Sequence, residues 1–236
     1  MRARIKDKRE VARGTLLVTF DLLGEEVEFT PGQYFFVTLP DVGYEDDKGL
    51  RRHITVVTSP NEKGVLGFAT RMRESAFKRS LGDLPVGAEV EVESPKGSFA
   101  LPEDTSRPLV FVAGGIGITV FRSMLRYIRE EGLPYRVMLL FSNRDRESAA
   151  FLDELQALEQ EIPDFRLVLT MTQDRGWLGE SRKMDARFFR DYLSEDLNGY
   201  TFLVAGPPAM VEGVQQALAE AGVAEENVRG ERYSGY

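Results

Sequence analysis

The sequence predicts two domains, an N-terminal antiparallel β-barrel followed by a C-terminal α/β domain with a doubly wound parallel sheet. Up to about residue 101, short segments rich in β-forming residues alternate with turn residues, which is typical of a closed barrel. From Leu109 onward, short continuous apolar runs alternate with helical patterns, which is typical of a buried parallel sheet. We therefore expect a boundary near residues 102–108, with domains over 1–103 and 107–236.

In the first half, β-branched and aromatic residues mark four strands, and turns with Pro or Gly separate them. The predicted strands cover residues 14–22, 33–39, 53–58 and 65–70. One segment breaks this pattern, because its apolar residues Phe77 and Leu81 are four positions apart. It predicts a short helix that starts near Ser75 and ends with Gly82 as its C-cap.

In the second half, each apolar run is followed by a segment with helical periodicity, as in successive βα units. The predicted strands cover residues 109–113, 137–141, 166–170 and 201–205. The predicted helices cover residues 121–131, 149–160, 186–193 and 209–221. Because the carboxyl ends of parallel strands share one edge of the sheet, we expect ligands to bind at that edge.

Composition narrows the class of protein. The chain has 236 residues and a net charge of −8, and its acidic balance argues against a general nucleic-acid binder. The absence of cysteine excludes disulfides and Cys-ligated clusters within this sequence, and the single histidine, His53, excludes a His-rich metal site. No apolar run reaches the roughly 20 residues of a membrane span, and no secretory signal is evident. We expect a cytoplasmic protein without a membrane span, and its oligomeric state stays open.

A glycine-rich turn follows the first strand of the second half, in the sequence Ala113-Gly-Gly-Ile-Gly-Ile-Thr119. Glycines at such a turn allow a pyrophosphate to approach the N-terminus of the next helix. The spacing departs from the usual dinucleotide fingerprint at Val120, and a tight turn without a ligand has the same pattern. The candidate binding residues are Gly114, Gly115, Ile116, Gly117, Ile118 and Thr119.

A second special turn, Ala205-Gly-Pro-Pro-Ala-Met210, follows the fourth strand of this half and therefore lies at the same predicted edge. Its prolines fit the first turn of a helix and could serve only that purpose. Two such turns at one edge nevertheless favour a bound dinucleotide. The candidates here are Gly206, Pro207, Pro208 and Met210.

The end of the second strand bears on which dinucleotide is bound. NAD sites usually place an acid there for the ribose hydroxyl, whereas an arginine suits a 2′-phosphate. Ser142, Asn143 and Arg144 follow Phe141 without an acid, so we expect NADP, with NAD as the alternative because Asp145 comes next. A solvated surface arginine would leave the same pattern.

Two basic segments occur in the barrel half of this acidic chain. The segment 51–58 places Arg52 three residues before the hydroxyl of Thr55, and the segment 70–79 holds four cations and two hydroxyls around the start of the short helix. Both suit phosphate binding, but without other context β-propensity explains the threonines of the first segment better, and an exposed basic helix face explains the second segment about as well. His53 alone is more often a packing residue than a catalyst.

Taken in chain order, these motifs resemble the ferredoxin–NADP⁺ reductase family of flavoproteins along nearly the whole chain. The family's Arg-x-Tyr-Ser/Thr motif is matched by Arg52-His-Ile-Thr55. By that match, Arg52 binds a flavin phosphate and Thr55 faces flavin N5. Ile54 replaces the tyrosine, so stacking on the ring is weaker. Ser75-Ala-Phe-Lys78 resembles the FAD variant of the family's second phosphate motif, with Lys78 at the serine position.

Other family motifs match with small departures. Ser94-Pro-Lys-Gly-Ser-Phe99 resembles Gly-Pro-x-Gly-x-Phe, and Val120 replaces the proline that ends the family's glycine turn. The resemblance therefore implies the following FAD-binding candidates. They are Arg52, His53, Ile54, Thr55, Thr70, Arg71, Met72, Ser75, Ala76, Phe77 and Lys78.

Two further features of the resemblance concern the nicotinamide side. Ala205 stands where the family has a cysteine, which affects hydride-transfer geometry or rate. The tail, 231–236, resembles the family ending in which an acid and an aromatic approach the flavin, and the aromatic acts as a gate. The catalytic candidates are Thr55, Glu231, Tyr233 and Tyr236.

The resemblance implies an FAD-containing oxidoreductase that passes hydride from NADPH to FAD and electrons onward. Because no cysteine is present to hold a cluster, the acceptor is expected to be a separate molecule, such as ferredoxin, flavodoxin or a small oxidant. Two alternatives stay open: a reductase that uses free flavin as a substrate, and a flavin-bound interaction or sensor subunit without turnover. The departures at Ile54, Val120 and Ala205 motivate the second alternative.

Overall fold

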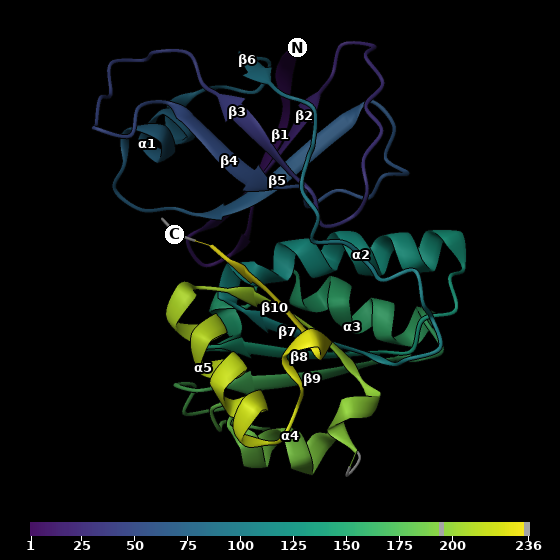
Figure 1. Ribbon diagram of the computed structural model, residues 1–236. Helices are drawn as coiled ribbons and strands as arrows, with labels where there is room; N and C mark the ends of the chain where they lie inside the picture. The colour runs from purple at the N-terminus through teal and green to yellow at the C-terminus, as the bar shows by residue number, and fades with distance from the viewer. Residues whose placement is uncertain (194–195, 234–236) are drawn as a thin grey trace.

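The computed structural model describes residues 1–193 and 196–233 and arranges them as a barrel above an α/β layer (Figure 1). The barrel is a six-stranded antiparallel sheet in the order β4-β3-β6-β1-β2-β5. Its strands are β1 (Arg2–Ala12), β2 (Thr15–Asp21), β3 (Tyr34–Thr38), β4 (Arg51–Thr55), β5 (Val65–Arg71) and β6 (Glu89–Val92). The two edge strands approach each other beyond β4, where the Val57 N–H donates to the Gly67 carbonyl at 2.9 Å.

The interior of the barrel is aromatic. Phe20, Phe35 and Phe68 are fully buried with ring centroids 5.7–6.3 Å apart. Helix α1 (Ala76–Asp83) adds Phe77 and Leu81 to the same cluster, which is why an apolar pair four residues apart folds as a helix here.

The predicted end of this short helix is wrong, because Gly82 lies inside α1 and the C-cap is Leu84. A lysine explains why no glycine cap is needed. The Lys8 amine donates to the Gly82 and Leu84 carbonyls at 2.8 and 2.5 Å, so it satisfies acceptors at the helix end.

The second half is a five-stranded parallel sheet in the order β11-β10-β7-β8-β9. Helices α2 and α3 cover one face, and α4 and α5 cover the other. The strands are β7 (Leu109–Gly114), β8 (Val137–Asn143), β9 (Phe165–Met171), β10 (Thr201–Gly206) and β11 (Val228–Arg232). The helices are α2 (Ile118–Glu131), α3 (Leu152–Glu161), α4 (Ala186–Tyr192) and α5 (Pro208–Glu220). No helix within the described parts of the chain is long and apolar enough to cross a membrane.

The predicted antiparallel barrel followed by a parallel α/β sheet is confirmed, and some element boundaries differ. Helix α2 starts at Ile118 because the 3₁₀ turn Gly115–Gly117 leads directly into it. Helix α3 starts at Leu152 because Asp145 and Ser148 form a capping box that closes a separate 3₁₀ turn before it.

A polar seam joins the two halves along α2, which lies against the barrel in Figure 1. The buried Arg122 guanidinium donates to the Val57 carbonyl at 2.7 Å, and the Ser123 hydroxyl donates to the Thr58 carbonyl at 2.6 Å. The carbonyls belong to the segment just after β4, so this seam fixes the end of β4 relative to the glycine-rich turn at the start of α2.

Candidate functional site

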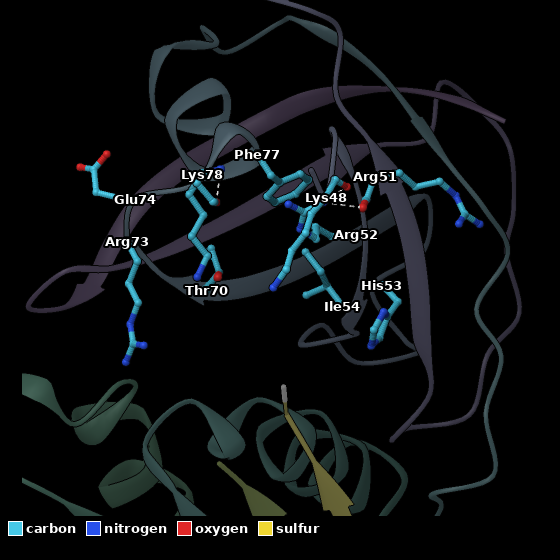
Figure 2. A pocket seen from close by; sticks show the side chains of 11 residues that line it. Lys48, Arg51, Arg52, His53, Ile54, Thr70, Arg73, Glu74, Phe77 and Lys78 are labelled. Atoms are coloured by element: carbon cyan, nitrogen blue, oxygen red, sulfur yellow. Dashed lines mark hydrogen bonds between the residues drawn. The ribbon is translucent and has the colours of Figure 1, made fainter. Parts of the chain in front are cut away.

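A cavity of about 470 Å³ opens beneath the barrel between β4 and α1 (Figure 2). It gathers most of the residues predicted to bind flavin, and its wall adds three cations that are not among the predicted binding residues, Lys48, Arg51 and Arg73. In Figure 2 the nitrogen ends of Lys48, Arg73 and Lys78 reach toward the open space below the barrel, whereas Arg51 points to the other side. The predicted residues in the cavity wall are Arg52, His53, Ile54, Thr70, Ser75, Phe77 and Lys78.

The cations of this cavity repel one another. Burial lowers the pKa of Lys78 to about 8, and three neighbouring guanidinium groups add to the shift. Those groups belong to Arg73, Arg52 and Arg71. Burial, followed by the charges of Arg144 and Arg73, also lowers the pKa of Arg71. Such crowding of buried positive charge is stabilised by an anion of high charge.

Arg52 has one half of its guanidinium engaged and the other half available. Its Nη1 donates to the Lys48 and Gly49 carbonyls at 2.7 and 2.8 Å, which ties down the loop before β4. Its Nη2 is buried and has no hydrogen-bond partner among the described residues, although Asp46 lies 3.7 Å away. A buried donor without a partner fits a phosphate oxygen in the cavity.

The other predicted flavin residues lie near this cavity rather than in its wall. The Ala76 N–H donates to Asp46 at 2.8 Å, and Met72 packs beside Gly82. Arg71 extends toward the other half of the molecule, where its Nη2 lies 3.7 Å from the position that a Cβ on Gly115 would take. A cation of the barrel therefore lies over the glycine-rich turn of the α/β half.

A second cavity, of about 260 Å³, lies between the two halves and is lined by Thr55 of the barrel and by Glu231 and Tyr233 of the tail. The structure thus brings together three of the four predicted catalytic residues, and Tyr236 lies outside the described residues. Pairing of β11 with β10 positions the tail, because the Tyr233 N–H donates to the Gly206 carbonyl at 2.9 Å. His53 borders both cavities and contacts the rings of Tyr34 and Phe36 edge-on or tilted, with centroids 5.8 Å apart.

Glu231 is the acid of this second cavity. Burial raises its pKa to about 7, and the hydrogen bond from the Tyr233 hydroxyl at 3.3 Å opposes that shift. Near neutral pH the carboxyl group therefore exists in both protonation states and can hold or release a proton.

The glycines at the sheet edge allow two turns to pack closely. A Cβ on Gly117 would lie 2.1 Å from the Ala205 carbonyl oxygen, and one on Gly114 or Gly206 would press on the Met210 thioether at about 3 Å. Thr119 is buried and donates to the Ile116 carbonyl at 3.0 Å, so its side chain stabilises the turn. Ile116 and Ile118 are core residues, Pro207 is the N-cap of α5, and Pro208 is its first residue.

The three residues after Phe141 point in different directions. Ser142 lines a cavity of about 590 Å³ beside α5, together with Met210 and Lys183. Asn143 is buried, and neither of its amide atoms has a hydrogen-bond partner in the described chain. Arg144 is exposed and lies near Arg71, not in the wall of the Ser142 cavity. Lys183 is therefore a cation that the sequence did not reveal, because it stands in a loop without a motif.

Two family models match this chain: residues 2–101 match the oxidoreductase FAD-binding domain, and residues 111–216 match the oxidoreductase NAD-binding domain. The electron transfer component of anthranilate 1,2-dioxygenase from Acinetobacter baylyi is 28% identical over 89% of this chain and 59% of its own length. The reductase component of propane 2-monooxygenase from Gordonia is 30% identical over 83% of this chain and 56% of its own length. The chain thus spans less than two thirds of the length of each of these relatives.

A solved structure has the same fold. It is a ferredoxin–NADP⁺ reductase from Neisseria gonorrhoeae with bound FAD and NADP, which superposes with a TM-score of 0.81 at 21% identity and covers 98% of both chains.

Proposed function

Because this chain belongs to the ferredoxin–NADP⁺ reductase-like family of FAD- and NAD-binding oxidoreductases, we propose that it takes electrons from NADPH through FAD and delivers them to a separate acceptor. The observation that carries this proposal is the cavity between the two halves, where Thr55 faces Glu231 and Tyr233. It lies between the cation-lined barrel cavity and the glycine turns of the parallel sheet.

The residues present fit FAD. The buried Nη2 of Arg52 and the crowded cations Arg73 and Lys78 suit its phosphates, and Ile54 offers an aliphatic wall for the ring. When bound, FAD supplies a carrier that accepts an electron pair from the nicotinamide and releases electrons onward. The protein's own part is to orient the two rings, to exclude water and to hold a proton on Glu231.

Glu231 provides a test of that proton-holding role. Because its pKa is about 7, turnover should fall as the pH rises through that value and the protonated form is lost. Glu231→Gln should remove this inflection from the pH profile of the rate. The measurement is steady-state turnover from pH 5.5 to 8.5, and an unchanged inflection in the variant would assign the titration to another group.

The cavity beside α5 supports a preference for NADPH. Its wall combines an apolar surface from Met184 and Met210 with the hydroxyl of Ser142 and the cation of Lys183, which suits an adenosine bearing a 2′-phosphate. The proximity of Arg144 to Arg71 suits the diphosphate instead.

Lys183→Gln is therefore expected to weaken binding of 2′,5′-ADP about tenfold while changing binding of 5′-AMP less than twofold. Arg144→Ala is the matched comparison and should weaken both ligands alike. Calorimetric titration measures both affinities. Equal losses for the two ligands in Lys183→Gln would contradict the assignment of the 2′-phosphate to Lys183.

The acceptor is proposed to be an acidic one-electron protein such as a ferredoxin or flavodoxin. Although the chain has a net charge of −8, the exposed cations Lys48 and Arg73 lie at the rim of the cavity beneath the barrel. Opposite charge on a partner would speed encounter at this face.

The deciding experiment is anaerobic reduction of the FAD-loaded protein by NADPH or NADH, followed by reoxidation with ferredoxin, flavodoxin, free flavin or ferricyanide. Bleaching by NADPH and faster reoxidation by the acidic proteins are expected. Flavin that stays oxidised in excess of both nucleotides would refute the proposed function and favour a subunit without turnover. Purification without bound colour would favour the use of free flavin as a substrate.

A further inference from the structure

The loop between β3 and β4, residues 39–50, lies along α1 and is attached near both ends of this helix. The Tyr44 hydroxyl donates to Asp83 at 2.6 Å, and the Arg79 guanidinium lies 4.4 Å from the centre of the Tyr44 ring. At the other end, the Asp46 carboxylate accepts the Ala76 N–H at 2.8 Å. The loop thus places a carboxylate at the first backbone donor of α1.

Asp46 is held there as an anion. The hydrogen bond from the Ala76 N–H lowers its pKa most, and backbone hydrogen bonds from Lys48 and Gly49 and the charge of Arg52 lower it further. Burial opposes these effects without reversing them. A negative charge at a helix N-terminus is also favourable in itself.

Two cavities adjoin near Asp46, which lines one of them. Glu74 and Ser75 line both the 470 Å³ cavity beneath the barrel and an adjoining cavity of about 530 Å³. The wall of the adjoining cavity includes Tyr44, Asp46 and Arg79. A flavin mononucleotide carries one phosphate, which Arg52 and Lys78 can bind within the first cavity. The dinucleotide has a second phosphate and an adenosine, and the adjoining cavity beyond Ser75 and the Ala76 N–H offers room for them.

We propose that Asp46 is a residue that determines flavin specificity, as an internal carboxylate that the second phosphate of FAD displaces from Ala76 and that FMN leaves in place. The inference rests on the proposed flavin site. Asp46 weakens FAD selectively, because only FAD brings a second negative charge to the N–H that Asp46 occupies.

The test compares flavin affinities of the protein after its flavin has been removed. FAD and FMN are titrated separately, and quenching of flavin fluorescence gives each Kd. Asp46→Asn should raise the affinity for FAD about fivefold more than the affinity for FMN, whose single phosphate gains only from the loss of the carboxylate that lies 3.7 Å from Arg52 Nη2. Asp47→Asn is the matched control, because it removes the same charge at the next position, where no side-chain hydrogen bond occurs within the described chain. It should leave the ratio of the two Kd values unchanged.

Asp46→Ala serves as a second variant, since it also removes the hydrogen bond that anchors the loop. Tighter FAD binding in this variant would support displacement of the carboxylate even more directly. Weaker FAD binding in Asp46→Asn would show that Asp46 only anchors the loop, and equal changes for both flavins would show a general charge effect. Either result overturns the proposal while leaving the flavin site intact. Failure of the unmodified protein to bind FAD and FMN would refute the flavin site itself.

Discussion

Replacing Arg52 with alanine is expected to weaken FAD binding by about a hundredfold. A charge-assisted hydrogen bond to a phosphate contributes about 1.5–3 kcal/mol, and the buried Nη2 of Arg52 has no hydrogen-bond partner among the residues that the structure describes. The change also frees the Lys48 and Gly49 carbonyls that Nη1 binds, so the loop before β4 loses its attachment. Both effects lower the affinity of the cavity for an anion.

The measurement is retention of FAD through gel filtration, followed by fluorescence titration of the flavin-free protein. Arg51→Ala is the matched control, because Arg51 belongs to the same strand but donates to Glu93 at 2.5 Å and stacks on Phe36, 3.6 Å from the ring centre. It removes the same charge from the opposite side of β4 and should reduce FAD affinity less than fivefold. Equal losses in both variants would mean that net charge, not the Nη2 donor, determines binding.

Most strands that the sequence predicts contain aromatic residues or continuous apolar runs. The core aromatics of β2, β3 and β5 and the continuous apolar runs of β7, β8 and β10 are visible without a structure because burial requires them. Strands β1, β6 and β11 were not predicted. Strand β6 has only two apolar residues, Val90 and Val92, between glutamates, and charged residues interrupt β11 at Val228–Arg232. Their pairing depends on partners far away in the chain.

The residues of the candidate site likewise fall into two groups, those that the sequence predicts and those that only the structure reveals. Residues in motifs of fixed spacing, such as Arg52 and Lys78, were found because a strand and a helix start hold them at one cavity. Loop residues such as Asp46 and Lys183 carry no periodic pattern, and only tertiary structure brings them to Ala76 or Ser142.

FAD binding is also expected to depend strongly on pH, and above pH 8 the protonation of Lys78 should determine the affinity. Its pKa of about 8 in the flavin-free protein reflects burial first and the neighbouring arginines second. A bound phosphate offsets those positive charges, so the pKa of Lys78 rises when FAD binds. Below pH 8 the lysine is already protonated and affinity is constant. Above pH 8 binding must take up a proton, so Kd should increase up to about tenfold per pH unit until the pKa of the bound form is reached.

Fluorescence titrations of the flavin-free protein between pH 6.5 and 9.5 measure this dependence. In weakly buffered solution at pH 9, the colour change of a pH-indicator dye on FAD binding measures the proton uptake directly. Lys78→Gln should bind FAD more weakly at pH 7 and lose the slope above pH 8, because no titrating group remains at that position. Lys48→Gln removes a charge from the same cavity wall and should keep the slope. A slope that persists in Lys78→Gln would assign the proton to another group, and a flat profile in the unmodified protein would mean that Lys78 does not contact a phosphate.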